Sequence, residues 1–369
     1  MSRLHPFDLS LLLLARRLNP LRVPLDRREA LAIAAADWEA VIGLASRQFV
    51  LAALAAVVRD LVPRDLLDLE LREFLEAVHA ANLERNRALR GQLLVAGGAL
   101  NRVGIEPVLL KGAIRLVDGL YPDPGWRMME DLDILVPAAQ VDAAVRALSG
   151  LGYRPVRPFD PAHKEVKLWG PGRALVEAHT ELFASPRQQR LLTGSDMIAT
   201  SKPCVLDGVR FRLPPVTQQM IHLIGHSQIG HFGHIYGRVS LRERLEAAAL
   251  IGWSGAPIDW QAVHGSFARA RYRRPLLAFL LALRDGDLSP APLPERRDGL
   301  LALQEGRIGR QARSSALFRF SLHVGWWVVL VKIQLTQRRL LLTTGRLLVN
   351  PQARRRITRT LLAARLRPW

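Results

Sequence analysis

Apolar residues recur at helical spacing through most of the first hundred residues. Residues 25–104 are rich in Ala, Leu, Arg and Glu, and one clear break interrupts the pattern at Val62-Pro63-Arg64. Apolar residues three and four positions apart share one face of a helix, so this region is predicted to form amphipathic helices. We expect a helical lead-in over residues 1–104.

The pattern then changes to short apolar runs, which are typical of strands, separated by segments with helical spacing. The predicted strands are 108–110, 132–136 and 174–179, and the predicted helices are 113–120 and 141–148. The alternating segment 201–214 turns at Asp207-Gly208 and predicts a hairpin. Together these elements predict an α+β unit over residues 105–215.

Helical spacing returns over 217–251, within a predicted helical region at 216–300. The last segment, 301–369, carries fourteen Arg or Lys residues against Glu305 alone, which accounts for 13 of the 19 net positive charges. We expect a basic amphipathic helical tail here. Arg319 and Lys332 bracket only twelve residues, whereas a membrane-spanning helix needs about 20.

Three interpretations of the basic tail stay open. It is a helical cap with a solvated basic face, a segment that lies on an anionic membrane surface, or an arm that binds nucleic acid. Nucleic acid ranks last, because no RNA-binding motif accompanies the charge.

Cysteine content and the N-terminus predict a cytoplasmic protein, peripheral at the inner membrane face if the tail binds lipid. Cys204 is the single cysteine, so no disulfide framework exists within the chain. The apolar run within residues 1–14 contains Asp8 and is closed by Arg16-Arg17, so it does not resemble a signal peptide.

Two carboxylates occupy alternate positions of the predicted strand 132–136. Alternate side chains share a face of a strand, so Asp131 and Asp133 point the same way, with their α carbons about 7 Å apart. Two hard oxygen ligands with an open side suit Mg²⁺, because Mg²⁺ shares its coordination shell with substrate phosphates. Mn²⁺ fits the same ligands. The competing interpretation is a solvated acidic end of a strand.

A turn at Lys111-Gly112 follows the first predicted strand and opens a helical segment. Glycine permits close approach of the backbone to a ligand, and free amides at a helix start attract phosphate. Lys111 and Arg127 each add a positive charge. We therefore predict nucleotide binding by Lys111, Gly112 and Arg127.

A third carboxylate is needed if two metal ions are to hold a transferring phosphoryl group. Glu177 is the best candidate, because it alternates with Val176 and Ala178 in a predicted strand. Glu181 is the nearer rival and Glu165 the more distant one. We predict that Asp131, Asp133 and Glu177 are both metal ligands and catalytic residues.

Four histidines lie in or next to the helical segment 217–251: His222, His226, His231 and His234. The first two are one helical turn apart, a spacing that can hold zinc. No HExxH glutamate stands between them, and the other two fall in a glycine-punctuated break. A packing or substrate-facing role is therefore favoured over a zinc site.

These motifs resemble the uncharacterised bacterial nucleotidyltransferase family of the DNA polymerase β-like superfamily. The matching residues are Leu110-Lys111-Gly112, Arg127, Asp131-Leu132-Asp133 and Glu177-Ala178-His179, within a resemblance over roughly residues 30–255. The chain departs from the family pattern at Thr180, where an aromatic is common, and at Glu246, where an Asp is often seen. Neither departure touches a proposed metal ligand.

The resemblance implies a polymerase β-like mixed sheet with a helical N-terminal lead-in and a helical C-terminal region. The implied activity is Mg²⁺-dependent transfer of a nucleoside monophosphate from an NTP to an unidentified acceptor. His163 and His179 match histidines of the family, and we assign them to the acceptor side. Two alternatives stay open: a non-catalytic nucleotide-binding protein, and a scaffold associated with a membrane or RNA.

Overall fold

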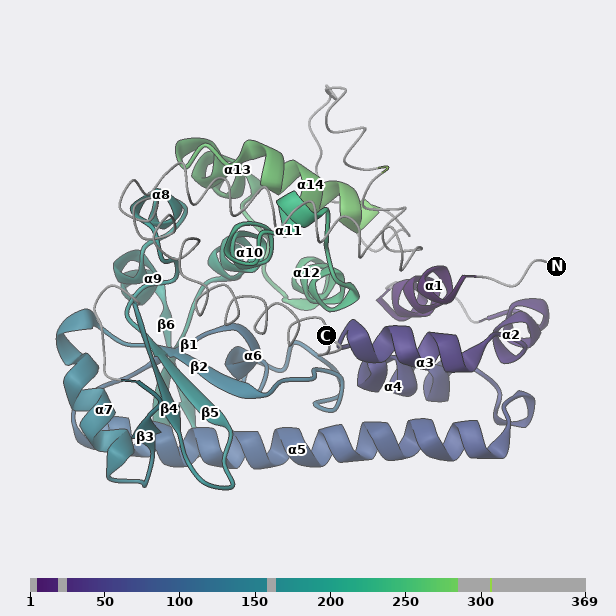
Figure 1. The fold of residues 1–369 in the computed structure, drawn as a ribbon, viewed down its shortest axis with the longest axis horizontal. Helices are drawn as coiled ribbons and strands as arrows, with labels where there is room; N and C mark the ends of the chain where they lie inside the picture. The colour runs from purple at the N-terminus through teal and green to yellow at the C-terminus, as the bar shows by residue number, and fades with distance from the viewer. Residues whose placement is uncertain (1–4, 19–24, 158–163, 285–305, 307–369) are drawn as a thin grey trace, which may run out of the picture.

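The computed structural model describes residues 5–18, 25–157, 164–284 and 306. The predictions for His163 and, apart from Gly306, for the basic tail fall outside the described residues. Figure 1 shows a sheet at one end of the molecule, a group of C-terminal helices above it and the N-terminal helices at the other end.

The N-terminal region is helical, as predicted. Its elements are α1 Pro6–Leu18, α2 Arg27–Ala34, α3 Trp38–Arg47, α4 Leu51–Leu61, the 3₁₀ turn η1 Arg64–Leu66, and α5 Leu69–Arg102. The predicted break at Val62-Pro63-Arg64 is confirmed between α4 and η1, but it is not the only break in the described part of this region. The chain also breaks before α3, where the Asp37 carboxylate caps the helix by accepting the amide of Ala40, and before α4, where Phe49 has a left-handed φ of 56°.

Helix α5 runs along the bottom of Figure 1 and underlies both ends of the molecule. Its 34 residues extend over about 51 Å at 1.5 Å per residue. Near its start, Leu75 joins the core of the N-terminal helices, whereas Leu89, Leu93 and Leu100 join the core beneath the sheet. One helix thus connects the lead-in to the sheet, and the proposed division at residue 104 falls just after its end.

The sheet is mixed and has the strand order β3-β4-β5-β2-β1-β7-β6 in the described residues. The strands are β1 Val108–Leu109, β2 Asp131–Leu135, β3 Arg154–Pro155, β4 Glu165–Trp169, β5 Leu175–His179, β6 Lys202–Leu206 and β7 Val209–Leu213. Strand β2 pairs parallel to β5 and antiparallel to β1. The predicted α+β fold with a mixed sheet is confirmed, but the carboxylates lie on the central strands and not at an edge of the sheet.

The two faces of the sheet pack against different cores. Leu132, Ile134 and Val176 face α5 and α7 (Val141–Ser149) and belong to one buried cluster. Leu135, on the opposite face, belongs to a second cluster that reaches from α1 to the C-terminal helices. This second face carries the polar residues of interest.

The C-terminal helices cover that second face (Figure 1). They are α8 Pro186–Gln189, α9 Gly194–Thr200, α10 Val216–Gly225, a π-helical turn His226–Gly230, α11 Gly233–Tyr236, α12 Leu241–Trp253, α13 Trp260–Arg269 and α14 Arg273–Arg284. The predicted helix over 217–251 is therefore broken in its middle, around the glycines, as the sequence indicates. None of the described helices is long and apolar enough to cross a bilayer.

Two local predictions had opposite outcomes. The hairpin is confirmed: Asp207 and Gly208 connect β6 to β7 with φ of 49° and 78°, the pair of positive values that a type I′ turn requires. The helix predicted over 113–120 is wrong in its bounds, because α6 spans only Lys111–Ile114. The side chain of Asp118 accepts the amide of Leu120, and Gly119 has φ +64°, which ends the helical turn there.

Helix α5 and strand β7 approach closely at Gly97. A Cβ atom at this position would lie 2.5 Å from the ring of Phe211 and 2.8 Å from Val209. Phe211 is fully buried, so its ring has no free space to move into. The absence of a side chain at Gly97 therefore sets the distance between helix and sheet.

We predict that Gly97→Ala destabilises the protein by about 1–3 kcal/mol through overpacking, although alanine is the better helix former. Gly91→Ala on the same helix is the matched control, because a Cβ there meets no atom within 4 Å. The control is expected to stabilise by up to about 1 kcal/mol. Urea denaturation measures both, and equal stabilisation by the two variants would contradict the close approach.

Candidate active site

Three carboxylates lie on one face of the central strands. Asp131 and Asp133 alternate along β2, and Glu177 on β5 is the direct cross-strand partner of Asp133. Residues paired across parallel strands point to the same face, so the register brings the three side chains together. The grouping predicted from the sequence is thus present in the structure.

Asp133 is the most deeply buried of the three, with 2% of its surface exposed. Its Oδ1 accepts a hydrogen bond from Lys111 Nζ at 2.7 Å and lies 2.8 Å from His179 Nε2. Burial alone would raise the pKa of Asp133, but Lys111 and His179 outweigh it and hold the pKa well below its usual value. Asp133 is therefore a buried, ionised carboxylate, and the competing interpretation of a solvated acidic strand end does not hold for it.

Glu177 is also buried, with 6% of its surface exposed. Its Oε1 accepts a hydrogen bond from Lys167 Nζ, and Lys167 pairs with Glu177 across β4 and β5. Burial would lower the pKa of Lys167, but Glu177 and Glu165 raise it above its usual value. The sequence analysis did not predict Lys167 as a residue of the site. The available signal was the alternation of Glu165 and Lys167, which places both side chains on the same face of β4.

Asp131 lies at the more open end of the group. Burial and the negative charges of Asp133 and Glu177 raise its pKa, and Lys111 and Arg127 oppose them. Three carboxylates are therefore held close together. The mutual repulsion of these groups favours an added cation.

The described residues contain one group of side chains with the spacing of a metal site. Asp133, Glu177 and His179 each offer a ligand atom, and these atoms lie within 4.8 Å of one another. Carboxylate and imidazole groups are suitable ligands for a divalent cation. In this structure the positive charges beside the two carboxylates are the ammonium groups of Lys111 and Lys167. Asp131 is on the same face but outside this trio, and His179, which we assigned to the acceptor side, lies among the carboxylates.

The two rival carboxylates have different positions. Glu181 Oε2 accepts the amide of Gly194 at 2.7 Å, at the start of α9, so it serves that helix and not the cluster. Glu165 on β4 pairs with His179 across the sheet, and its Oε2 lies 3.6 Å from His179 Nδ1. Glu165 thus borders the cluster from the outer side.

The turn that carries Lys111 is strained and tightly packed. Lys111 has a left-handed φ of 47°, which directs its side chain toward Asp133. Gly112 is buried, and a Cβ there would lie 3.3 Å from the Cβ of Met129. The glycine therefore allows this turn to pack against the segment that leads into β2.

Arg127 is bound to the C-terminal helices. Its Nε lies 3.1 Å from Glu246 Oε2, while Arg115 Nε lies 3.3 Å from Glu246 Oε1. Burial would lower the pKa of Arg127, but the negative charge of Glu246 raises it above its usual value. Burial would raise the pKa of Glu246, but Arg127 and Arg115 hold it below its usual value. Glu246, a departure from the family pattern, is the buried acceptor of both guanidinium groups.

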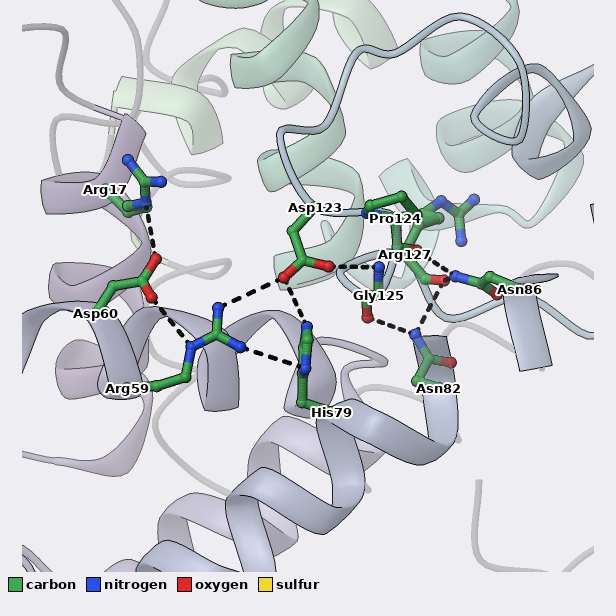
Figure 2. Close-up of polar contacts among 10 residues, drawn as sticks. All are labelled: Arg17, Arg59, Asp60, His79, Asn82, Asn86, Asp123, Pro124, Gly125 and Arg127. Atoms are coloured by element: carbon green, nitrogen blue, oxygen red, sulfur yellow. Dashed lines mark hydrogen bonds and ion pairs between the residues drawn. The ribbon is translucent and has the colours of Figure 1, made fainter. Parts of the chain in front are cut away.

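The loop before β2 is also fixed to α5 (Figure 2). Asn86 Nδ2 donates to the carbonyls of Pro124 and Arg127 at 2.6 and 2.8 Å. Asn82 Nδ2 donates to the carbonyls of Gly125 at 2.6 Å and Arg127 at 3.2 Å. The backbone of Arg127 is thus held by two amides while its side chain is held by Glu246.

A chain of ion pairs extends from this loop to α1 (Figure 2). His79 Nε2 lies 2.8 Å from Asp123 Oδ2, and Arg59 lies between Asp123 and Asp60. Arg17 Nε lies 3.6 Å from Asp60. The N-terminal helices therefore support the loop that positions Arg127.

Histidines of α10 and the π-helical turn lie near the cluster. Burial, Lys111 and His179 lower the pKa of His222 to about 3, so its imidazole is neutral at pH 7. Burial and Lys111 also lower the pKa of His226, which stacks edge-on with His231. In the described part of the chain these histidines are not members of the metal-spaced group, so the zinc alternative finds no support.

A family model described as an uncharacterised nucleotidyltransferase matches residues 34–285. The match covers more than half of the 369 residues, includes the whole cluster, and extends past the expected limit at 255 to include α13 and α14. No curated protein matches the chain.

We predict that Glu246→Gln destabilises the protein by about 3 kcal/mol, because it removes the carboxylate that pairs with buried Arg127 and leaves buried Arg115 with Asp118 in place of two acidic partners. Glu76→Gln is the matched control, since Glu76 pairs with Arg64 on the exposed surface. The control should cost less than about 1 kcal/mol. Chemical denaturation at pH 7 measures the free energy of unfolding of both variants. Similar losses of stability would contradict the importance of the buried ion pairs of Glu246 with Arg115 and Arg127.

The difference in stability between wild type and Glu246→Gln should depend on pH. The folded-state pKa of Glu246 is lowered from the usual value of 4.5, so its contribution is complete above pH 4.5 and is lost as pH falls through the lowered pKa. We therefore expect the gap between the two proteins to narrow below pH 4.5. A gap that stays constant from pH 7 to pH 3 would show that the ionised carboxylate does not matter.

Proposed function

Because the chain belongs to the uncharacterised nucleotidyltransferase family and is a nucleotidyltransferase, we propose that it moves a nucleoside monophosphate from an NTP to an acceptor hydroxyl or phosphate. The observation that carries the proposal is the group of three carboxylates on β2 and β5, two of them buried and paired with lysines. A sheet face does not bury this much like charge for packing alone.

Asp131, Asp133 and Glu177 would hold the divalent cation, for which we proposed Mg²⁺ or Mn²⁺. When bound there, the cation would neutralise phosphate charge and stabilise the transferring group. The raised pKa of Asp131 and the ionised state of Asp133 support this use, because crowded carboxylates gain most from an added positive charge.

Lys111 and Arg127 are proposed to face the triphosphate. The Lys111 ammonium lies at the carboxylates, within reach of a nucleotide that shares their cation. Arg127 acts electrostatically on Asp131 while Glu246 fixes its guanidinium. A side chain fixed in advance adds positive charge without the entropic cost of ordering it on binding. The packed Gly112 turn would present its backbone beside Lys111.

The acceptor side of the site is proposed to involve Glu177 and His179, with His163. Glu177 can accept a proton from an acceptor hydroxyl while Lys167 limits its movement. His222 and His226 are neutral, so they would offer hydrogen bonds without adding charge.

The basic tail keeps a second candidate open. Thirteen net positive charges within 301–369 favour association with an anionic membrane surface, and with nucleic acid as the lesser case. On this reading the protein is a scaffold associated with a membrane or RNA, and the carboxylates would be dispensable. A non-catalytic nucleotide-binding protein is a separate alternative, against which the intact Asp131 and Asp133 argue. Placement in the cytoplasm, peripheral at the membrane, stays part of the proposal.

We predict that Asp131→Asn or Asp133→Asn lowers nucleotidyl transfer at least a hundredfold, since each removes charge worth several kcal/mol from the site. Asp142→Asn, at an exposed position of α7 beyond the opposite face, is the matched control. Transfer of label from each α-³²P NTP to acceptors in a lysate of the source cells provides the measurement.

Asp133 is buried and paired, so the folded state of its variant must be verified by circular dichroism before activity is compared. Label transfer that survives in folded Asp131→Asn/Asp133→Asn protein would exclude the proposed chemistry. It would direct attention to the scaffold alternative.

A further inference from the structure

We propose that His179 is a direct metal ligand, so that Asp133, Glu177 and His179 bind a first-row transition-metal ion in preference to Mg²⁺. This inference rests on the proposed function, because that proposal assigns Asp133 and Glu177 to a cation. It adds a nitrogen donor to the site and changes the class of metal ion that the enzyme would use.

The spacing of the donor atoms supports a shared ion. His179 Nε2 lies 2.8 Å from Asp133 Oδ1 and 3.7 Å from Glu177 Oε2. Two ligand atoms each about 2.1 Å from one ion are about 3.0 Å apart at a right angle and about 3.4 Å apart at a tetrahedral angle. The observed separations bracket these values. All three residues are buried, His179 with 7% of its surface exposed.

The imidazole is also oriented like that of a metal-binding histidine. Its Nε2 faces the two carboxylates, and its Nδ1 faces Glu165 on β4, at 3.6 Å from Oε2. Metal-bound histidines usually direct the second ring nitrogen to a carboxylate, which fixes the tautomer with the first nitrogen free to bind. Nε2 now hydrogen-bonds Asp133 Oδ1, so the proton between them must be released, or be carried by Nδ1 facing Glu165, when an ion binds. At 3.6 Å the contact is longer than a hydrogen bond, and a small rotation of Glu165 would close it.

The lysines decide which metal ions can compete. Lys111 and Lys167 neutralise Asp133 and Glu177, so an entering ion must displace two ammonium groups. Mg²⁺ gains little from imidazole and prefers oxygen ligands and water, whereas first-row transition-metal ions bind imidazole strongly. A nitrogen donor therefore favours the transition-metal ion at this position, while Asp131 lies outside the trio, on the side toward Arg127.

The test uses the full-length protein, Mn²⁺ as the probe and electron paramagnetic resonance as the readout. We expect bound Mn²⁺ whose electron spin echo is modulated by one imidazole ¹⁴N nucleus, and a hundredfold excess of Mg²⁺ should displace less than half of it. Histidine labelled with ¹⁵N should change the modulation in the wild type, which identifies a histidine donor without any mutation.

Variants then identify which histidine binds. His179→Gln should lose the nitrogen modulation and bind Mn²⁺ at least tenfold more weakly. Glu165→Gln should keep the modulation and weaken binding by a smaller factor. His222→Gln is the matched control, because His222 is the buried histidine that also feels the charges of His179 and Asp133; its modulation should be unchanged.

Several results would overturn the inference: no Mn²⁺ binding, bound Mn²⁺ without nitrogen modulation, equal competition by Mg²⁺, or loss of modulation in His222→Gln instead of His179→Gln. These outcomes are distinct from failure of the proposed function. If Asp133→Asn loses nucleotidyl transfer but Mn²⁺ bound to the wild type shows no nitrogen modulation, the proposed transferase activity stands and His179 is rejected as a metal ligand. If wild-type Mn²⁺ shows the nitrogen modulation but no nucleotidyl transfer is found, His179 stands as a ligand and the proposed activity is rejected.

Discussion

One buried carboxylate joins the two halves of the site. Glu246 on α12 binds Arg115, which follows the Lys111 turn, and Arg127, which precedes β2. Both segments that bring charged groups to the carboxylates are therefore fastened to the helical half through Glu246, and Arg115 also donates a hydrogen bond to Gln219 of α10. The side-chain amides of Asn82 and Asn86 on α5 donate to the backbone carbonyl of Arg127 and complete the support. The loop is therefore held from two sides, and Arg127 has little freedom to move.

Charge balance gives the sheet face its chemical character. Register alone places Asp133 beside Glu177, and two lysines from different elements offset part of the negative charge. A face arranged in this way is stable without a cation and still attracts one, because Asp131 keeps an unfavourable surplus of negative charge. The same arrangement explains why the ammonium groups and any bound cation would compete for the same oxygen atoms.

Short-range patterns were sufficient to predict much of this fold. Alternation predicted strands at 132–136 and 174–179, each within one residue of the observed bounds, and it predicted the face shared by the carboxylates, because side chains repeat every two residues. Contacts between distant segments could not be predicted from short-range patterns. The contact of Lys167 with Glu177 depends on the register of β4 against β5, and Glu246 contacts Arg127 across 119 residues of the chain. Helix α6 was overestimated for a related reason, since Arg115 is drawn toward Glu246 and Asp118 caps the turn that follows.

The core shared by distant elements also has a consequence for biosynthesis. Helix α1 packs against α12, although about 220 residues separate the two helices along the chain. At a synthesis rate of 5–20 residues per second, the face of α1 that α12 covers waits roughly 10–45 s for its partner to be translated. The growing chain must therefore keep a leucine-rich helix from aggregating on the ribosome, and a chain that ends after the sheet would leave that face of α1 uncovered.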